Sequence, residues 1–201
     1  MGHRGAHDGA DHVTYEFTHD WFSMRTNAWR EHVLPLLPHP CRWLEIGSHE
    51  GRSACWMLDE ALKPGDTIAC VDTWGGPFDG YSAENPEARF DANVAGRAEK
   101  FKGRSHVFLA RALAEYRMFD GIYIDGGHEG RVVLEDTVLA WRLLKVGAVI
   151  VWDDYEWTDP YPHRQHLATP KPAIDAFLSL YGECLEVVHR EWQVIAVKRG
   201  E

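Results

Sequence analysis

The chain has 201 residues, which is enough for one domain with a full hydrophobic core and leaves little room for a second. Hydrophobic residues make up 45% of it and charged residues 26%, a balance typical of a folded, water-soluble protein. With 21 basic against 31 acidic residues, a formal net charge of −10 and no apolar run near the roughly 18 residues of a membrane span, the sequence argues against nucleic acid or a membrane as a partner.

Residues 1–14 are rich in glycine, histidine and aspartate and lack the apolar core of a secretory signal, so we expect a disordered leader there. Residues 15–201 then form the single expected domain. The cysteines lie far apart and form no Cys-x-x-Cys pair, which favours reduced thiols and a cytoplasmic location. They are Cys41, Cys55, Cys70 and Cys184.

Residues 15–38 are predicted to form a helical segment ahead of the first strand. Trp29, Val33 and Leu36 recur at helical intervals, and Pro38 ends the pattern. We expect this segment to lie against the sheet, or over the ligand pocket as a lid.

The stretch that follows predicts a buried strand, Cys41–Ile46, then a glycine turn and the start of a helix. Glu45 lies near the strand end, and Gly47 and Gly51 bracket a turn where glycine lets the backbone approach a ligand closely. The spacing is neither the dinucleotide fingerprint nor a phosphate loop. A carboxylate here suits a ligand with an ammonium group and ribose hydroxyls, and Glu-x-Gly-x-x-x-Gly resembles the first motif of class I S-adenosylmethionine-dependent methyltransferases. The alternative is an ordinary strand, turn and helix.

A second strand is predicted from Thr67 to Asp72, apolar until its terminal acid. An acid at a second strand end, about 20 residues after a glycine loop, is placed to accept hydrogen bonds from ribose hydroxyls. The alternative is a helix cap or a plain surface acid. The loop 73–85 contains Trp74 and Tyr81, which either cover a cofactor or acceptor or are simply buried.

The remaining elements alternate before a closing hairpin. Helices are predicted from Pro86, over Arg111–Arg117 as a short helix or turn, over Arg131–Leu144 and over Pro172–Tyr181. Strands are predicted over Ser105–Leu109, Phe119–Asp125, Ala148–Trp152, Leu185–His189 and Trp192–Lys198, the last two pairing antiparallel. This order predicts a three-layer α/β fold, with ligands beyond the carboxyl ends of the strands.

Acidic residues end several strands on that side of the sheet. Asp125, followed by Gly-Gly-His128, ends one strand, and Asp153 and Asp154 follow the next. Because neighbouring strands are about 4.8 Å apart, these carboxylates can converge on Mg²⁺, Mn²⁺ or Ca²⁺, which prefer oxygen ligands. With S-adenosylmethionine in the same pocket such a cation suits O-methylation, and His128 can accept the proton of the acceptor hydroxyl. The alternatives are a structural histidine and a loop cap with one exposed acid.

The longer run around these acids resembles one branch of the class I methyltransferases. The matching segments are Asp120–His128, Leu144–Gly147 and Val149–Tyr155. This branch includes the macrocin and mycinamicin sugar O-methyltransferases and the cephalosporin-hydroxylase-like proteins, and the resemblance covers roughly Trp43 to Lys198. It implies a Rossmann-like methyltransferase fold, a mostly parallel seven-stranded sheet with a C-terminal antiparallel hairpin.

The resemblance also implies a site, residue by residue. The cation ligands are Asp125, Asp153 and Asp154; Asp125 and His128 are catalytic, with His128 as the candidate base. The cofactor contacts are Glu45, Gly47, Ser48, Gly51 and Ser53 around the methionine part, Asp72 and Thr73 at the ribose, and Asp125. Two features depart from the branch. The adenine-contacting segment after the third strand reads Ala110-Arg111-Ala112, without an acid or serine, and the acidic pair is Asp-Asp where the mycinamicin type has Glu-Asp.

The loop 154–169 is the expected acceptor side, because loops of this length in a compact domain are usually functional or disordered. Its acceptor candidates are Trp157, Tyr161, His163 and His166, with loop packing as the alternative. The expected function is S-adenosylmethionine-dependent, divalent-cation-assisted O-methylation of a small hydroxylated molecule, a sugar or natural product, by a chain that can form a homo-oligomer. A metal-independent methyltransferase with His128 as base and a non-catalytic S-adenosylmethionine-binding module stay open as alternatives.

Overall fold

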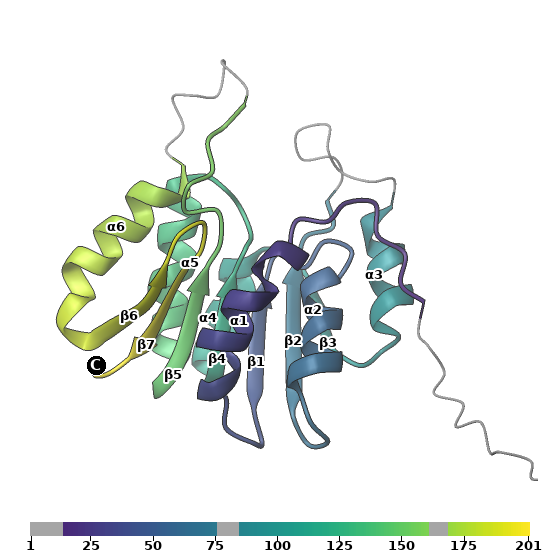
Figure 1. Ribbon diagram of the computed structural model, residues 1–201, viewed down its shortest axis with the longest axis horizontal. Coiled ribbons are helices and arrows are strands. Elements are labelled where there is room, and N and C mark those ends of the chain that lie inside the picture. The colour runs from purple at the N-terminus through teal and green to yellow at the C-terminus, as the bar shows by residue number, and fades with distance from the viewer. Residues whose placement is uncertain (1–13, 76–84, 161–168) are drawn as a thin grey trace, which may run out of the picture.

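The computed structural model describes residues 14–75, 85–160 and 169–201. Within these ranges seven strands form one sheet in the order β3-β2-β1-β4-β5-β7-β6 (Figure 1). They are β1 (Arg42–Ile46), β2 (Thr67–Asp72), β3 (Glu99–Lys102), β4 (Phe119–Ile124), β5 (Leu144–Trp152), β6 (Leu185–Arg190) and β7 (Val194–Lys198). Strands β1 to β5 pair in parallel, and β7 pairs antiparallel with both β5 and β6. The predicted mostly parallel sheet with a C-terminal antiparallel hairpin is therefore confirmed.

Helices cover both faces of the sheet, which gives the three predicted layers (Figure 1). On one face lie η1 (Ser23–Arg25), α1 (Thr26–His32), η2 (Leu34–Leu36), α2 (Arg52–Trp56), its continuation η3 (Met57–Ala61) and α3 (Pro86–Val94). On the other lie α4 (Ser105–Ala114), α5 (Gly130–Leu143) and α6 (Pro170–Tyr181), with η5 (Gly182–Cys184) after it. None of the helices in the described ranges has the length and apolar character needed to cross a membrane.

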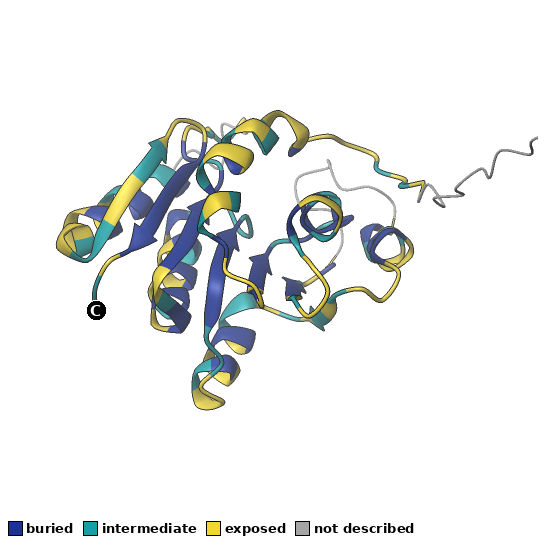
Figure 2. Cartoon of the chain, turned by 60° about the horizontal axis from the view of Figure 1, so that its bottom comes forward, coloured by how far each residue is buried: buried dark blue, intermediate teal, exposed yellow. Residues whose placement is uncertain are grey.

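The sheet divides the hydrophobic core into two clusters. Leu44 and Ile46 of β1 pack on the side of α4, α5 and α6, whereas Trp43 packs on the side of α1 and α2. Successive residues of a strand point to opposite faces, so a strand covered on both faces is apolar throughout. Figure 2 shows the result: the central strands are buried between the helices, whereas the edge strand β6 is partly exposed.

One predicted strand is wrong. Residues 105–109 begin the helix α4, and the third strand of the sheet is instead Glu99–Lys102. Phe108, Leu109 and Ala112 fall on one face of that helix and are buried, a helical spacing that a short apolar run conceals. The real strand β3 lies at the sheet edge and is polar and partly exposed, so it carries no apolar run to reveal it.

The N-terminal segment also differs from its prediction. Only Ser23–Leu36 is helical, in the three short pieces η1, α1 and η2, and the chain before Ser23 is irregular, with bends at Thr18, Trp21 and Phe22. This irregular part, residues 15–22, is called the strap below. The expected leader falls almost entirely in residues 1–13, outside the described ranges, and stays a prediction.

Candidate active site

The glycine loop after β1 is pressed against the end of β4. Gly47 has φ of 88°, and a β-carbon there would lie 1.8 Å from the carbonyl oxygen of Asp125. Gly51 has φ of 82° and begins α2 with Phe90 of α3 close beside it. Glycine is therefore required at both positions, by backbone conformation and, at Gly47, by space. The loop and the acidic end of β4 are thus in direct backbone contact.

Asp72, at the end of β2, holds this loop in place through hydrogen bonds. Its Oδ2 accepts hydrogen bonds from the backbone N–H groups of Ser48 (2.9 Å) and His49 (2.8 Å), and its Oδ1 accepts from that of Trp74 (2.7 Å). The indole of Trp74 donates to the carbonyl of His49 at 2.7 Å. Three of the four acceptor sites of the Asp72 carboxylate are thus used to shape the loop, which leaves one, on Oδ1, for a ligand. Thr73 follows it on the surface.

Glu45 is buried without a partner. Its side chain is 0% exposed, and neither carboxylate oxygen makes a hydrogen bond. Burial raises the pKa of Glu45 to about 7, while the nearby hydroxyls of Ser48 and Ser53 act in the opposite direction. A buried carboxylate without a partner is costly, and a positively charged ligand group would relieve that cost. The ammonium group of S-adenosylmethionine fits this requirement.

A second acidic centre lies at the ends of β4 and β5. Ligand atoms of Asp125, His128 and Asp154 all lie within 4.8 Å of one another, close enough to hold one ion. His128 Nε2 lies 2.9 Å from Oδ2 of Asp154. Asp154 reaches this position with φ of 59°, a left-handed conformation that side chains rarely adopt and that concentrates at functional sites.

Charge repulsion within this centre favours a cation. Burial raises the pKa of Asp125 well above its usual range, and the charges of Asp153 and Asp154 act in the same direction. Oxygen-rich sites of this kind suit Mg²⁺, Mn²⁺ or Ca²⁺. The donor set therefore fits the predicted cation, with Asp125 and Asp154 in the cluster as expected and His128 beside them.

Asp153 is oriented differently from the other two acids. Its Oδ2 accepts from the Gln193 amide at 2.8 Å and lies within hydrogen-bond distance of the Tyr123 hydroxyl, and its Oδ1 accepts from the N–H of Asp154 at 2.7 Å. Tyr123 and Gln193 carry no sequence signal for a site, since a buried tyrosine in a strand and a glutamine in a turn are ordinary. Their role appears only in three dimensions.

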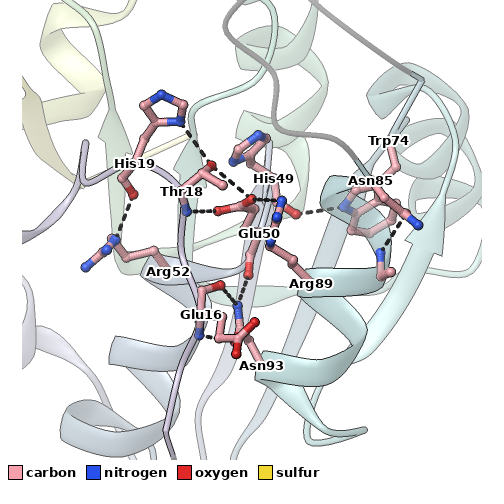
Figure 3. A network of polar contacts seen from close by, with 11 residues as sticks. Glu16, Thr18, His19, His49, Glu50, Arg52, Trp74, Asn85, Arg89 and Asn93 are labelled. Carbon is pink, nitrogen blue, oxygen red and sulfur yellow. Dashed lines mark hydrogen bonds and ion pairs between the residues drawn. The ribbon is translucent and has the colours of Figure 1, made fainter.

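The strap crosses the glycine loop and is fixed there by Glu50 (Figure 3). The backbone N–H and the hydroxyl of Thr18 donate to the Glu50 carboxylate at 2.7 and 3.0 Å, and Arg89 donates to it at 3.1 Å. Asn93 of α3 donates to the carbonyl oxygens of Glu16 and Glu50, both at 2.9 Å. The irregular strap, rather than a helix, therefore lies over this part of the site.

The acceptor candidates are only partly placed. The ring of Trp157 lies 4.7 Å from that of His128, centroid to centroid, so this tryptophan borders the acidic centre. Tyr161, His163 and His166 lie outside the described residues, as does Tyr81.

The corrected third strand removes one apparent departure from the resemblance. Residues 110–112 lie inside α4, and the segment that follows β3 reads Gly103-Arg104-Ser105. The N–H of Gly103 donates to the carbonyl of Asp72 at 2.8 Å, which sets this turn beside the end of β2. The segment after β3 therefore contains a serine, and the prediction that it lacks one was wrong because it placed the third strand at 105–109.

Comparison with known protein families establishes the family to which the chain belongs. A methyltransferase domain family matches residues 44–155, more than half of the chain, from β1 to the acidic pair after β5. The chain belongs to this methyltransferase family. No curated protein sequence matches the chain significantly.

Solved structures share the fold of this methyltransferase at low sequence identity. An O-methyltransferase from Bacillus cereus in complex with S-adenosylhomocysteine is 19% identical, with a TM-score of 0.65 over 90% of this chain and 84% of its own. The O-methyltransferase TomG from Streptomyces achromogenes, involved in tomaymycin synthesis, is 23% identical, with a TM-score of 0.59 over 87% and 80%. The MycE methyltransferase of the mycinamycin pathway, with Mg and S-adenosylhomocysteine, is 18% identical, with a TM-score of 0.61 over 90% of this chain and 51% of its own.

Proposed function

We propose that this methyltransferase transfers a methyl group from S-adenosylmethionine to a hydroxyl of a small molecule, assisted by a divalent cation. The observation that carries the proposal is that two acidic groups, at the carboxyl ends of neighbouring strands, each call for a positive charge. Glu45 lies buried without a partner beside the glycine loop, and Asp125 and Asp154 converge with His128 at the adjoining strand end. The first suits the ammonium group of the cofactor and the second a cation.

The cofactor would lie along the carboxyl edge of β1, β2 and β4. Glu45, Ser48 and Ser53 would bind its methionine part, with Gly47 and Gly51 allowing close approach of the backbone. Asp72 and Thr73 would meet the ribose, and Asp125 would border the reacting methyl group. The N–H groups at the start of α2 add partial positive charge near the carboxylate of the methionine part.

The acidic centre would position the acceptor. Asp125 and Asp154 would hold a divalent cation, which would supply Lewis acidity toward the acceptor hydroxyl. His128 would take the hydroxyl proton, with its imidazole oriented by Asp154 at 2.9 Å. The acceptor oxygen then forms a bond to the methyl carbon as the bond from carbon to sulfur breaks, which releases S-adenosylhomocysteine. Trp157 would pack against the acceptor.

A sugar or another hydroxylated natural product is the acceptor class we propose. One of the structures of similar fold contains Mg, S-adenosylhomocysteine and mycinamycin VI. The acidic chain, with net charge −10, suits neither nucleic acid nor an anionic membrane. The described cysteines are all free thiols, which is consistent with a cytoplasmic location.

The test is release of S-adenosylhomocysteine from S-adenosylmethionine and a panel of hydroxylated acceptors, in Mg²⁺ and in a chelator. Turnover in Mg²⁺ that is lost in chelator supports the proposal. Turnover that survives full chelation would support the second candidate, a metal-independent methyltransferase, which the 2.9 Å contact of His128 with Asp154 also permits because that pair can act as a base without an ion. Cofactor binding without turnover on any acceptor would favour a binding module.

A further inference from the structure

A chain of buried hydrogen bonds runs from the N-terminal helix to the acidic centre. The indole N–H of Trp29 in α1 donates to Oε1 of Gln193 at 2.8 Å, and Nε2 of Gln193 donates to Oδ2 of Asp153 at 2.8 Å. The Tyr123 hydroxyl lies within hydrogen-bond distance of that same oxygen and 2.9 Å from Oδ2 of Asp125. Trp29 and Tyr123 are 0% exposed and Gln193 is 1% exposed. Three distant parts of the chain thus converge behind the site.

The hydrogen bonds of Asp153 leave it little capacity for a cation. A carboxylate oxygen has two acceptor sites. On Oδ2 of Asp153, one site accepts from the Gln193 amide and the other faces the Tyr123 hydroxyl, whose single proton lies between this oxygen and Oδ2 of Asp125. Oδ1 is used once, by the N–H of Asp154. Asp125, by contrast, has one oxygen bonded to Tyr123 and lies in the cluster with His128 and Asp154, which does not include Asp153. Asp153 therefore lies outside the group of side chains that converge on the place where a cation would be held.

The tip of the C-terminal hairpin holds both acids of the pair. Gln193 binds Asp153, the indole of Trp192 donates to Oδ1 of Asp154 at 3.3 Å, and the carbonyl of Trp192 accepts from the N–H of Tyr155 at 2.9 Å. The hairpin was predicted only as the element that closes the sheet. Its tip instead fixes the backbone and side chains at the end of β5.

Hydrophobic packing does not explain why the Tyr123 hydroxyl and the Gln193 amide lie in this buried cluster. The Tyr123 ring packs edge-on against Trp29, with centroids 4.9 Å apart, and phenylalanine would make the same contact. The hydroxyl and the amide are retained in a buried cluster where each polar group costs free energy unless it is fully paired. A fully paired buried network rigidifies the groups that it joins.

We propose that Tyr123 and Gln193 are positioning residues that hold Asp153. Asp153 in turn acts as a buried support for Asp125 and Asp154. These two acids, together with His128, face the cation and the acceptor. The inference rests on the proposed function. It assigns Asp153, predicted as a cation ligand, an indirect role, and it gives Trp29 of the N-terminal segment a place behind the site rather than over it. Groups that orient metal ligands in this way typically change metal affinity by about 10- to 100-fold when they are removed.

The test compares single substitutions that remove one hydrogen-bonding group each. Tyr123→Phe removes the hydroxyl, and Gln193→Met removes the amide at similar volume. Tyr155→Phe is the matched control, because Tyr155 is also buried and its hydroxyl donates to a carboxylate, Asp175 at 2.7 Å, outside the network. For each full-length variant we would measure Mn²⁺ affinity by electron paramagnetic resonance with S-adenosylmethionine present, S-adenosylmethionine affinity, and thermal unfolding.

We expect Mn²⁺ affinity to fall about 10- to 100-fold in Tyr123→Phe and Gln193→Met, with S-adenosylmethionine affinity within about twofold and no change in the Tyr155→Phe control. Asp153→Asn should keep weakened Mn²⁺ binding, whereas Asp125→Asn should lose it. If Tyr123→Phe does not fold, Gln193→Met, in a turn, provides the same readout.

Three outcomes would contradict the inference, and they are distinguishable. If the wild-type protein binds Mn²⁺ and the affinity is unchanged in Tyr123→Phe and Gln193→Met, the positioning role alone is wrong. The same holds if Asp153→Asn loses Mn²⁺ binding as completely as Asp125→Asn does. Wild-type protein that binds no Mn²⁺ would contradict the cation in the proposed function and the positioning role with it.

Discussion

A β-carbon on Gly47 would lie 1.8 Å from the carbonyl oxygen of Asp125, so the glycine loop and the acidic strand end touch through their backbones. Neither atom belongs to a flexible side chain that can move aside. The cofactor loop and the acidic centre are therefore placed relative to each other by main-chain packing, and a change at one is transmitted to the other.

Gly47→Ala should consequently be severe. We expect it to lower the free energy of unfolding by more than about 3 kcal/mol, because it combines backbone strain with a backbone clash. Gly65→Ala is the control: it has φ of 98° but nothing within 4 Å of the added carbon, so it should cost only the strain of about 1–2 kcal/mol. Urea denaturation of both variants measures the difference, and equal losses would show that the contact with Asp125 is unimportant.

Cofactor affinity should depend on pH through Glu45. Burial raises the pKa of Glu45 to about 7 in the free protein, so below that pH the carboxyl is protonated and must lose its proton to pair with an ammonium group. The association constant for S-adenosylmethionine should therefore rise about tenfold per pH unit from pH 5 to 7 and then level off. Calorimetric titration measures the profile. It should flatten in Glu45→Gln, and a flat profile in the wild type would argue against the ion pair.

The strap should loosen when its hydrogen bonds to Glu50 are removed. Thr18→Val eliminates the 3.0 Å bond from the hydroxyl to a carboxylate that is 2% exposed, which should cost about 1–3 kcal/mol for a bond to a charged group. Hydrogen exchange of the backbone amides in residues 15–22 should accelerate, and Thr18→Ser should restore protection because serine keeps the hydroxyl. Unchanged exchange in Thr18→Val would mean that the strap is held by its other contacts.

Asp136 of α5 should make stability depend on pH in the opposite sense to a salt-bridged acid. It is 1% exposed, and burial raises its pKa to about 6. Because this is above the value of about 3.9 expected in the unfolded chain, its contribution is fully favourable below pH 4 and is lost as pH rises through 6. Asp136→Asn should match the wild type near pH 4 and exceed it by about 3 kcal/mol at pH 8, since two pKa units correspond to that energy.

Urea denaturation across pH checks this prediction. Asp120→Asn is a useful comparison, because Asp120 is also buried but accepts from the backbone N–H of Arg42 at 2.9 Å and from the ammonium group of Lys145 at 2.7 Å. That variant should be destabilised. Loss of stability in Asp136→Asn at pH 8 would show instead that the ionised carboxylate has a favourable partner.

The sequence predicts those elements of the fold whose burial leaves an apolar pattern in their own residues. Val149, Ile150 and Val151 form a continuous apolar run because β5 is covered on both faces, and that run identified a central strand. Strand β3, at the sheet edge, has residues such as Lys102 that face solvent, so only its pairing with β2 defines it. The strap is held by side-chain contacts across the chain rather than by its own periodicity.

The site likewise has a part that the sequence predicts and a part that it does not. Asp125 and Asp154 end neighbouring strands, and the parallel order of the sheet was enough to predict that they meet. The orientation of Asp153 could not be predicted, because it depends on Gln193, which in turn binds a tryptophan 164 residues away in the sequence. Contacts of that separation leave no pattern in a single sequence.

The measurement that tests the account most directly is calorimetric titration of S-adenosylmethionine into the full-length protein, in Mg²⁺ and then in a chelator, with Asp125→Asn alongside. The account predicts cofactor binding in both buffers and a separate Mg²⁺ isotherm that Asp125→Asn abolishes. Failure of the wild-type protein to bind S-adenosylmethionine in either buffer would contradict the assignment of Glu45 and the glycine loop, and the proposed function with it.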